Sequence, residues 1–135
     1  MARPRLEVSA VTIGAPDPRA LAAFYSRLLG WEVANEEGPA PGAPPGDGWA
    51  QLRSPPGEPR FSLNFEFEPH YEPPVWPSEP GRPEIMAHLD VWVQDLDEAV
   101  EWATASGAIE AGYQPQDGVR VMLDPAGHPF CLFTG

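Results

Sequence analysis

The 135-residue sequence contains one pattern twice, and this repetition constrains the fold more than any other feature. Residues 8–30 and residues 86–107 each begin with alternating apolar residues, pass through an aspartate into a stretch with helical spacing, and end at a glycine. Alternation is typical of a strand with one buried face, and an aspartate before an amphipathic stretch is typical of a helix N-cap. Each half is therefore expected to begin with a strand and a helix.

The predicted helix ends agree in the two halves. Asp17 and Asp95 stand at the N-cap positions, and Pro18 suits the first helical turn. Gly30 and Gly107 suit left-handed caps at the C-terminal ends. Between these ends the apolar residues recur at i, i+3, i+4 and i+7, which are Leu21, Phe24, Tyr25 and Leu28 in the first half and Leu96, Ala99, Val100 and Ala103 in the second.

Strand parity assigns each side chain of the two leading strands to one of two faces, because successive side chains of a strand point to opposite sides. The residues expected to face the helices are Val11, Ile13, Leu89, Val91 and Val93. The residues expected on the other face are Ala10, Thr12, Gly14, His88, Asp90 and Trp92.

The rest of each half also corresponds. Each contains a strand that runs into a turn rich in proline and glycine, at 48–57 and 118–127, and a further strand after that turn, at 61–68 and 130–133. Two more strands are expected near 31–36 and 109–114. Each half is thus predicted to be a βαβββ module.

Proline and glycine, 19 and 13 residues, define the domain organisation because they gather between the predicted elements. We expect a single domain over 1–135, with module one at about 5–68 and module two at about 84–135. The segment 38–48 is expected to be a mobile loop, and the proline-rich segment 69–83 an extended linker.

Composition excludes several classes of function. The eight basic residues are all arginine, so lysine-based Schiff-base, pyridoxal-phosphate and P-loop chemistry is excluded. A net charge of −12 opposes binding to nucleic acid, and no apolar run reaches the length needed for a membrane span. The single cysteine excludes an internal disulfide, and without a predicted secretion signal the cytoplasm is the expected compartment.

Three motifs resemble the vicinal oxygen chelate superfamily, which contains glyoxalase I, extradiol dioxygenases, fosfomycin-modifying enzymes and bleomycin-resistance proteins. These motifs are APDPRALAAFYSRLLGW at 15–31, HLDVWVQDLDEAV at 88–100 and DPAGHPFCLF at 124–133, and they are most similar to the small glyoxalase-like proteins. The resemblance implies an α+β fold in which two βαβββ modules form an open, incomplete β-barrel around a cavity, with the helices outside. It also implies a homodimer.

Metal-dependent members of the superfamily take ligands from the first and last strands of each module. His88 matches the ligand histidine of module two, but its module-one counterpart is Ala10, which cannot bind a metal. Cys131 stands where the pattern has a glutamate. In module one the corresponding position is left open among Ser62, Asn64 and Glu66. The resemblance therefore implies an incomplete metal site, and a divalent metal, if bound, would use His88 and Glu66, with Cys131 as a further candidate. His88 and Asp90, two apart on one strand face, are an alternative chelating pair without a second histidine.

The interpretation that we favour treats His88 as a cavity histidine hydrogen-bonded to Asp90, and Cys131 as a small, partly apolar lining residue. Arg120 shares strand parity with Met122, and either binds an acidic group in the cavity or forms a surface ion pair. The residues predicted to bind the ligand are His88, Asp90, Trp92, Trp49, Glu66, Asn64, Arg120, Cys131 and Phe133.

Two functions are then weighed. The first is a small-molecule binding protein of the glyoxalase/bleomycin-resistance type, which holds a planar or hydrophobic metabolite or antibiotic among aromatic side chains without a complete metal site. The second is a metal-dependent glyoxalase-like lyase or isomerase that uses His88 and Glu66. The sequence leaves open whether the protein is an enzyme, and no cofactor is expected for the first function.

Overall fold

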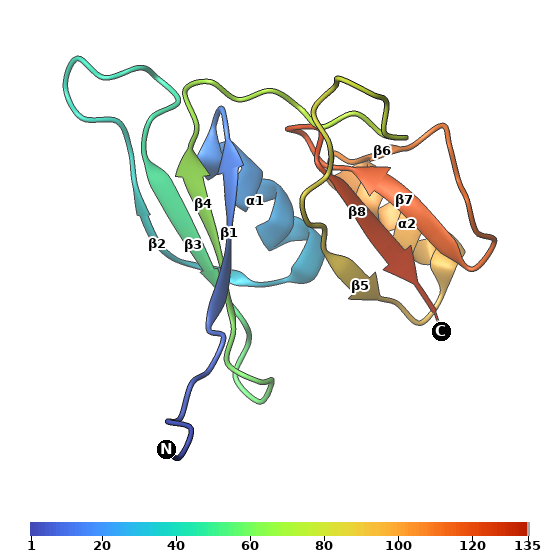
Figure 1. Ribbon diagram of the computed structural model, residues 1–135, viewed down its shortest axis with the longest axis horizontal. Coiled ribbons are helices and arrows are strands. Elements are labelled where there is room, and N and C mark those ends of the chain that lie inside the picture. The colour runs from blue at the N-terminus through green and yellow to red at the C-terminus, as the bar shows by residue number, and fades with distance from the viewer. Residues whose placement is uncertain (135) are drawn as a thin grey trace. The chain divides into compact units, whose positions relative to one another are not determined.

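The computed structural model describes residues 1–134 and divides the chain into two compact units, residues 1–68 and residues 69–135. Each unit contains one four-stranded sheet and one helix, and the element order of the first is repeated in the second (Figure 1). The proline-rich segment 69–83 belongs to the second unit by its contacts.

The first unit is a βαβββ module. Its elements in order are β1 (Ala10–Ala15), α1 (Pro18–Leu29), β2 (Glu32–Glu37), β3 (Trp49–Arg53) and β4 (Ser62–Phe67). The sheet order is β1-β4-β3-β2, with β1 and β4 parallel and the other neighbours antiparallel.

The second unit repeats this topology. Its elements are β5 (Asp90–Trp92), α2 (Leu96–Ser106), β6 (Ile109–Glu110), β7 (Val119–Leu123) and β8 (Pro129–Phe133). The sheet order is β5-β8-β7-β6, again with one parallel pair, β5 and β8. The structure therefore confirms the predicted α+β fold of two βαβββ modules, and among the described residues neither sheet closes into a barrel.

The predicted caps at Asp17, Asp95 and Gly30 are confirmed, whereas Gly107 ends α2 at φ 123°, outside the left-handed helical conformation expected for it. Asp17 Oδ1 accepts a hydrogen bond from the backbone N–H of Ala20 at 3.1 Å, and Asp95 Oδ1 accepts one from Glu98 at 2.9 Å. These bonds satisfy N–H groups that the first helical turn leaves without a partner. Gly30 ends α1 in the left-handed conformation at φ 71°, which a residue with a side chain rarely adopts.

In both units the helix covers one face of the sheet. Leu52, Leu63 and Phe65 of the first sheet are buried together with Phe24 and Tyr25 of α1, and Tyr25 stacks on Phe65 with ring centroids 5.6 Å apart. In the second unit the corresponding buried residues are Met122, Phe130, Leu132 and Ala103. Burial of one such large apolar side chain contributes roughly 1.5–3 kcal/mol.

The opposite side of each sheet, which we call the helix-distal face, carries the residues that strand parity predicted. In the first sheet Thr12 pairs with Asn64, and Gly14 pairs with Glu66. In the second sheet Asp90 pairs with Cys131, and Trp92 pairs with Phe133. Paired residues of neighbouring strands share a face, so these eight side-chain positions lie away from the helices.

The strand predicted at 109–114 forms only at Ile109–Glu110. Beyond it, the side chain of Gln114 pairs with the backbone of β7. Its Oε1 accepts from Val121 N–H at 2.8 Å, and its Nε2 donates to Val121 O at 2.9 Å. The backbone N–H of Ala111 still donates to Val121 O at 3.0 Å, so the pairing passes from backbone to side chain between Ala111 and Gln114.

The segment 38–48 contains no strand, as predicted, but it approaches its neighbours closely. A side chain at Gly46 would place Cβ 2.1 Å from Pro16 O, and one at Gly48 would place it 2.2 Å from Glu37 O. Both contacts would be impossible for a residue with a side chain, so this segment depends on glycine where it packs against the sheet.

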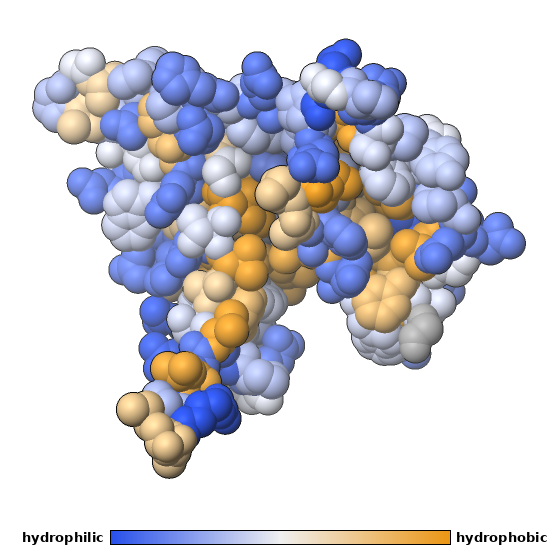
Figure 2. All heavy atoms as spheres, viewed as in Figure 1, coloured by the Kyte–Doolittle hydropathy of each residue, from blue (hydrophilic) through white to orange (hydrophobic). Residues whose placement is uncertain are grey.

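The surface over β2 and β3 is mostly hydrophilic in the space-filling view (Figure 2). Strand β2 has the sequence EVANEE and is exposed at every position except Ala34. Within residues 1–134 no helix has the length and apolar character needed to cross a membrane.

Candidate functional site

The helix-distal face of the first sheet is organised in two polar rows. One row runs across the strands through Glu37, Trp49 and Glu66, and ends at Gly14. The neighbouring row contains Asn35, Gln51, Asn64 and Thr12. WAQLR in β3 and SLNFEF in β4 alternate, so the pleat places their polar residues on one side. EVANEE in β2 does not alternate, and beyond a register shift between Val33 and Asn35 its residues Asn35 and Glu37 lie on this face.

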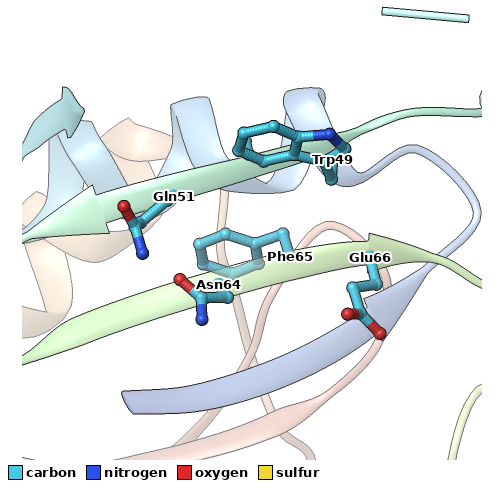
Figure 3. A pocket seen from close by; sticks show the side chains of 6 residues that line it. Trp49, Gln51, Asn64, Phe65 and Glu66 are labelled. Carbon is cyan, nitrogen blue, oxygen red and sulfur yellow. The ribbon is translucent and has the colours of Figure 1, made fainter. Parts of the chain in front are cut away.

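A pocket of about 180 Å³ lies on this face. The residues that line it come from β3 and β4 and are Trp49, Ala50, Gln51, Asn64, Phe65 and Glu66 (Figure 3). The Trp49 side chain is part of its wall and the residue is 40% exposed. Its indole Nε1 donates a hydrogen bond to Glu37 Oε2 at 3.1 Å, which fixes the ring against the edge of β2.

The polar groups around the pocket are the carboxylates of Glu37 and Glu66 and the amides of Gln51 and Asn64. Among the described residues, neither Glu37 nor Glu66 has an ion-pair partner. Asn64 Oδ1 is buried and has no hydrogen-bond partner, whereas Gln51 Oε1 accepts from Asn35 Nδ2 at 3.2 Å. A buried oxygen without a donor is unusual in a folded protein, and leaving it unpaired is costly.

The second unit brings three predicted site residues together on its own helix-distal face. His88 Nε2 lies 3.1 Å from Asp90 Oδ1, and the ligand atoms of His88, Asp90 and Cys131 all lie within 4.8 Å of one another. The predicted contact between His88 and Asp90 is therefore present. Both side chains are reachable from solvent, at 43% and 61% exposure.

The thiol of Cys131 is not activated. Burial raises its pKa, and the negative charge of Asp90 raises it further. A nucleophilic cysteine needs the opposite shift, which a neighbouring cation or helix N-terminus would provide. The environment of Cys131 therefore supports the interpretation of this residue as a lining residue.

The donor set of this cluster fits one kind of metal. An imidazole, a carboxylate and a thiol are the ligands that Zn²⁺ takes in proteins, with a fourth position left for water or substrate. The same set suits Mg²⁺ or Mn²⁺ poorly, because those ions favour oxygen ligands. His88, Asp90 and Cys131 would hold such an ion, and a bound Zn²⁺ would supply Lewis-acid chemistry.

The strand register decides between the three open positions of the first module. Asp90 precedes the N-cap Asp95 by five residues and pairs with Cys131. Thr12 precedes Asp17 by the same interval and pairs with Asn64. Asn64 is therefore the structural counterpart of Cys131.

By the same register, Glu66 is the counterpart of Phe133, because Gly14 and Trp92 occupy equivalent positions. The first unit thus presents Ala10 and Asn64 where the superfamily pattern has metal ligands. An alanine and a neutral amide form a poor ligand pair.

Arg120 lies apart from the other predicted site residues. It pairs with Leu132, which is buried on the helix side, and not with Cys131. Its Nε lies 3.6 Å from Glu110 Oε1, and its Nη1 donates to Asp117 O at 2.8 Å. The cavity position considered for Arg120 is therefore wrong, and the ion pair is what forms.

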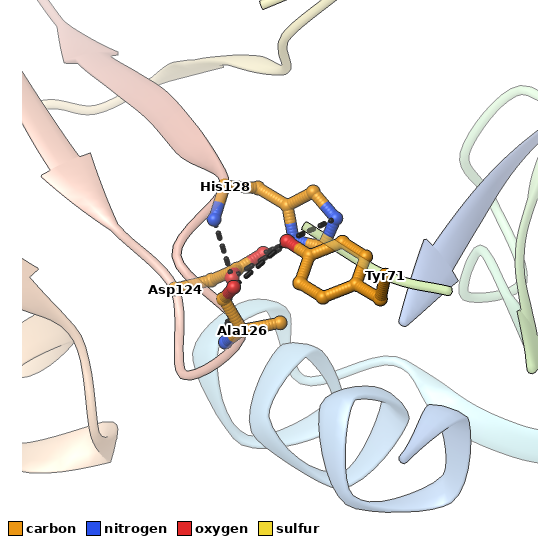
Figure 4. Close-up of polar contacts among 4 residues, drawn as sticks. All are labelled: Tyr71, Asp124, Ala126 and His128. Carbon is orange, nitrogen blue, oxygen red and sulfur yellow. Dashed lines mark hydrogen bonds and ion pairs between the residues drawn. The ribbon is translucent and has the colours of Figure 1, made fainter. Parts of the chain in front are cut away.

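A second polar cluster was missed by the sequence reasoning. The carboxylate of Asp124 is buried and accepts hydrogen bonds from the backbone N–H groups of Ala126 and His128, while His128 Nδ1 lies 2.8 Å from Asp124 Oδ2 (Figure 4). Tyr71 Oη donates to Ala126 O at 2.7 Å and lies 3.2 Å from His128 Nε2. Burial, and then the charge of Asp124, raise the pKa of Tyr71 to about 12.

This cluster fastens the linker to the turn before β8. Trp76 makes a second attachment, because its Nε1 donates to Tyr113 O at 3.1 Å. The sequence does signal the Asp124–His128 half, as an aspartate four residues before a histidine across a tight turn. Nothing in the sequence links Tyr71 to that turn, since more than fifty residues separate them.

Comparisons with known proteins agree with this architecture. The profile of the glyoxalase-like domain matches residues 10–133. A glyoxalase family protein from Enterococcus faecalis is 22% identical with a TM-score of 0.65, over 94% of this chain and 96% of that one. No curated protein matches the sequence.

Two other similar structures differ from each other in what they bind. An antibiotic-binding protein from Streptomyces sp. CB03234 is 18% identical with a TM-score of 0.59, over 98% of both chains. A fosfomycin resistance protein from Listeria monocytogenes, complexed with Mn(II), is 16% identical with a TM-score of 0.64, over 96% of this chain and 92% of that one. At these identities the likeness concerns the fold.

Proposed function

This chain belongs to the family of glyoxalase-like domains, and from that premise we propose that it binds a small planar organic molecule on the helix-distal face of its first sheet. The observation that carries the proposal is the pocket formed by β3 and β4, where an exposed indole stands beside polar acceptors. Such a combination of one apolar surface and a few fixed polar groups is typical of small-molecule sites.

The chemistry of the second unit supports binding over catalysis. Its one cysteine has a raised pKa, so the thiol is protonated at neutral pH and a poor nucleophile. Its buried carboxylate, Asp124, is already occupied by two backbone N–H groups and by His128. The antibiotic-binding protein from Streptomyces is a precedent for ligand binding on this fold.

Tryptophan fluorescence tests this function. A panel of planar aromatic metabolites and antibiotics is titrated into the protein, and Tm is followed in parallel. We expect at least one compound to quench the fluorescence and raise Tm. The change should disappear in Trp49→Phe and persist in Trp92→Phe, which removes an exposed indole from the second sheet. A panel with no response by either method would contradict the proposal.

A second candidate function is that of a metal-dependent glyoxalase-like enzyme, and the His88, Asp90 and Cys131 cluster favours it. Sequence reasoning paired His88 with Glu66, whereas the donor atoms of this cluster come from one unit. Elemental analysis of protein purified without chelator separates the two functions. One bound Zn per chain, lost in His88→Ala and in Cys131→Ser, would favour the enzyme.

We also propose that the chain forms a homodimer, as the resemblance implies. Light scattering coupled to size-exclusion chromatography measures this directly, with a mass near 29 kDa expected for two 14.7 kDa chains. A mass of one chain at all concentrations would contradict it.

A further inference from the structure

We propose that the pocket on the first sheet selects planar organic cations that carry N–H donors, such as amidinium or aminoaromatic groups. This inference rests on the proposed function and narrows it to one class of ligand. Three independent features of the pocket carry it: its charge, its aromatic wall and its acceptor without a donor.

The charge comes from two carboxylates on one row of the sheet. Glu37 and Glu66 are the register neighbours of Trp49 on either side, so a negative group flanks the indole on both β2 and β4. Among the described residues no arginine or histidine forms an ion pair with either. An anionic ligand would be repelled here, whereas a cationic ligand would supply the positive charge that these two carboxylates lack.

The aromatic wall adds a second reason for a cation. The negative face of an indole attracts cations more strongly than the other aromatic side chains do. The Trp49 ring is partly exposed and is held through its bond to Glu37, so a ligand meets a surface that is already fixed in place. A planar cation can stack on this ring and keep its charge near the carboxylates at the same time.

The acceptor without a donor explains why the ligand should carry N–H groups. Asn64 lines the same pocket as Trp49 and Glu66, and its Oδ1 is buried without a partner, so a ligand donor reaches this oxygen when the amide turns toward the pocket. The neighbouring amide oxygen, that of Gln51, is already used by Asn35. A quaternary ammonium would satisfy the charge but would leave Asn64 Oδ1 without a donor, whereas an amidinium satisfies both.

The size of the pocket limits the ligand, or the part of it that enters, to one or two rings. Its volume of about 180 Å³ is below the range usual for drug-sized molecules. Benzamidine, benzamide and benzoate form a suitable probe set, because they share one planar shape and differ in charge. Benzamidine is a cation with N–H donors, benzamide is neutral with N–H donors, and benzoate is an anion.

The test is a calorimetric or NMR titration of the three probes into the full chain. We expect benzamidine to bind at least about tenfold more tightly than benzamide, and benzoate to bind the least. Glu66→Gln should lower the affinity for benzamidine about fivefold or more, while the affinity for benzamide changes by less than about twofold. The matched control is Glu36→Gln, because Glu36 pairs with the buried Ala50 and so lies on the other side of the sheet.

The remaining outcomes separate this inference from the proposed function. If benzamide or benzoate binds as tightly as benzamidine and binding is lost in Trp49→Phe, the pocket is a ligand site but the cation class is wrong. If Glu36→Gln weakens benzamidine as much as Glu66→Gln does, only net charge matters and the inference fails. If none of the probes binds to the folded protein and the fluorescence panel is also silent, the proposed function fails as well.

Discussion

The two units of this protein share one topology but differ in chemistry on their helix-distal faces. Toward the helices the buried centre of each sheet is apolar, with Phe65 in one and Leu132 in the other at equivalent positions. On the other side the first sheet carries amides, carboxylates and an indole, and the second carries His88, Asp90 and Cys131. The helix-facing side therefore preserves the fold, while the distal side is free to differ.

The two helix-distal faces differ most clearly in the first strand of each unit, β1 and β5. In β1 the distal residues are small, Ala10, Thr12 and Gly14, and the polar groups stand on β4. In the second unit His88 precedes β5 and Trp92 ends it, so bulky side chains occupy the equivalent positions. Gly14 places no side chain beside Glu66, whereas Trp92 stands beside Phe133. The positions beside Glu66 are therefore small in the first unit, whereas bulky side chains stand at the equivalent positions of the second.

The largest expected effect on stability concerns the helix-facing side of the sheets, which the two units have in common. Phe65→Ala should lower the free energy of unfolding by about 3–5 kcal/mol, because it empties space in a fully buried cluster with Tyr25. Leu132→Ala, at the equivalent position, should cost about 2–5 kcal/mol. Urea denaturation followed by circular dichroism measures both. A cost below about 1 kcal/mol at either position would break the equivalence of the two cores.

A smaller effect is expected where the two units use glycine differently. Gly48 and Gly118 each stand immediately before the third strand of their unit. Gly48 has a φ of 125° and lies against Glu37 O, so Gly48→Ala should cost about 2–3 kcal/mol. Gly118 has open space around it, so Gly118→Ala should be neutral or slightly stabilising. Equal thermal shifts for the two variants would contradict this contrast.

The turns before β4 and β8 provide the next comparison. Asp124 is buried and accepts from two backbone N–H groups and from His128, so Asp124→Ala should cost about 2 kcal/mol. Its counterpart Ser54 accepts one backbone N–H, from Phe61, and donates to Pro59 O, so Ser54→Ala should cost about 1 kcal/mol or less. Chemical denaturation measures the free energy of unfolding of both variants. A larger loss of stability in Ser54→Ala than in Asp124→Ala would contradict this order.

Tyr71 makes the second unit sensitive to alkali. Its pKa is raised from 10 to about 12 in the folded protein, so the folded state holds the phenolic proton more tightly than the unfolded state does. The resulting stability is constant below pH 10 and is lost as the pH rises from 10 toward 12. In Tyr71→Phe this part of the pH dependence should vanish. Denaturant midpoints at several pH values check it, and an identical alkaline profile in the variant would exclude Tyr71 as its source.

The smallest effect concerns the reactivity of Cys131. Because the charge of Asp90 contributes to the raised pKa of the thiol, Asp90→Asn should lower that pKa and increase the thiolate fraction at pH 8. Iodoacetamide should then alkylate Cys131 about two- to fivefold faster, as measured by mass spectrometry. Asp117→Asn, on the loop before β7, is the control and should leave the rate unchanged. An unchanged or slower rate in Asp90→Asn would contradict the assignment.

Much of the fold could be predicted from the sequence because the repeat, the caps and the alternation are local patterns. Asp17, Asp95 and Gly30 identified the helix ends correctly, and alternation placed Asn64 and Glu66 on one face. The end of the strand after Glu110 could not be foreseen, since beyond it the side chain of Gln114 bonds to Val121 in place of the backbone.

The candidate site was predicted only in part, for physical reasons. Residues two apart on one strand, such as His88 and Asp90, reveal their contact through parity. The face of Arg120 was left open, because parity sorts side chains into two sets and does not say which set the helix covers. The contacts of Tyr71 with the 124–128 turn, and the burial of Asn64 Oδ1, arise from packing between distant segments and leave no periodic trace.

The most direct test of the central claim, that the first unit and not the second binds the ligand, is a map of amide chemical shifts. A ¹⁵N-labelled sample of the full chain is titrated with benzamidine. We predict that the perturbed amides lie at 49–51 and 64–66, around Trp49, and that those at 88–92 and 131–133 remain unchanged. Shifts concentrated around His88 and Cys131, with the first sheet unaffected, would contradict the account.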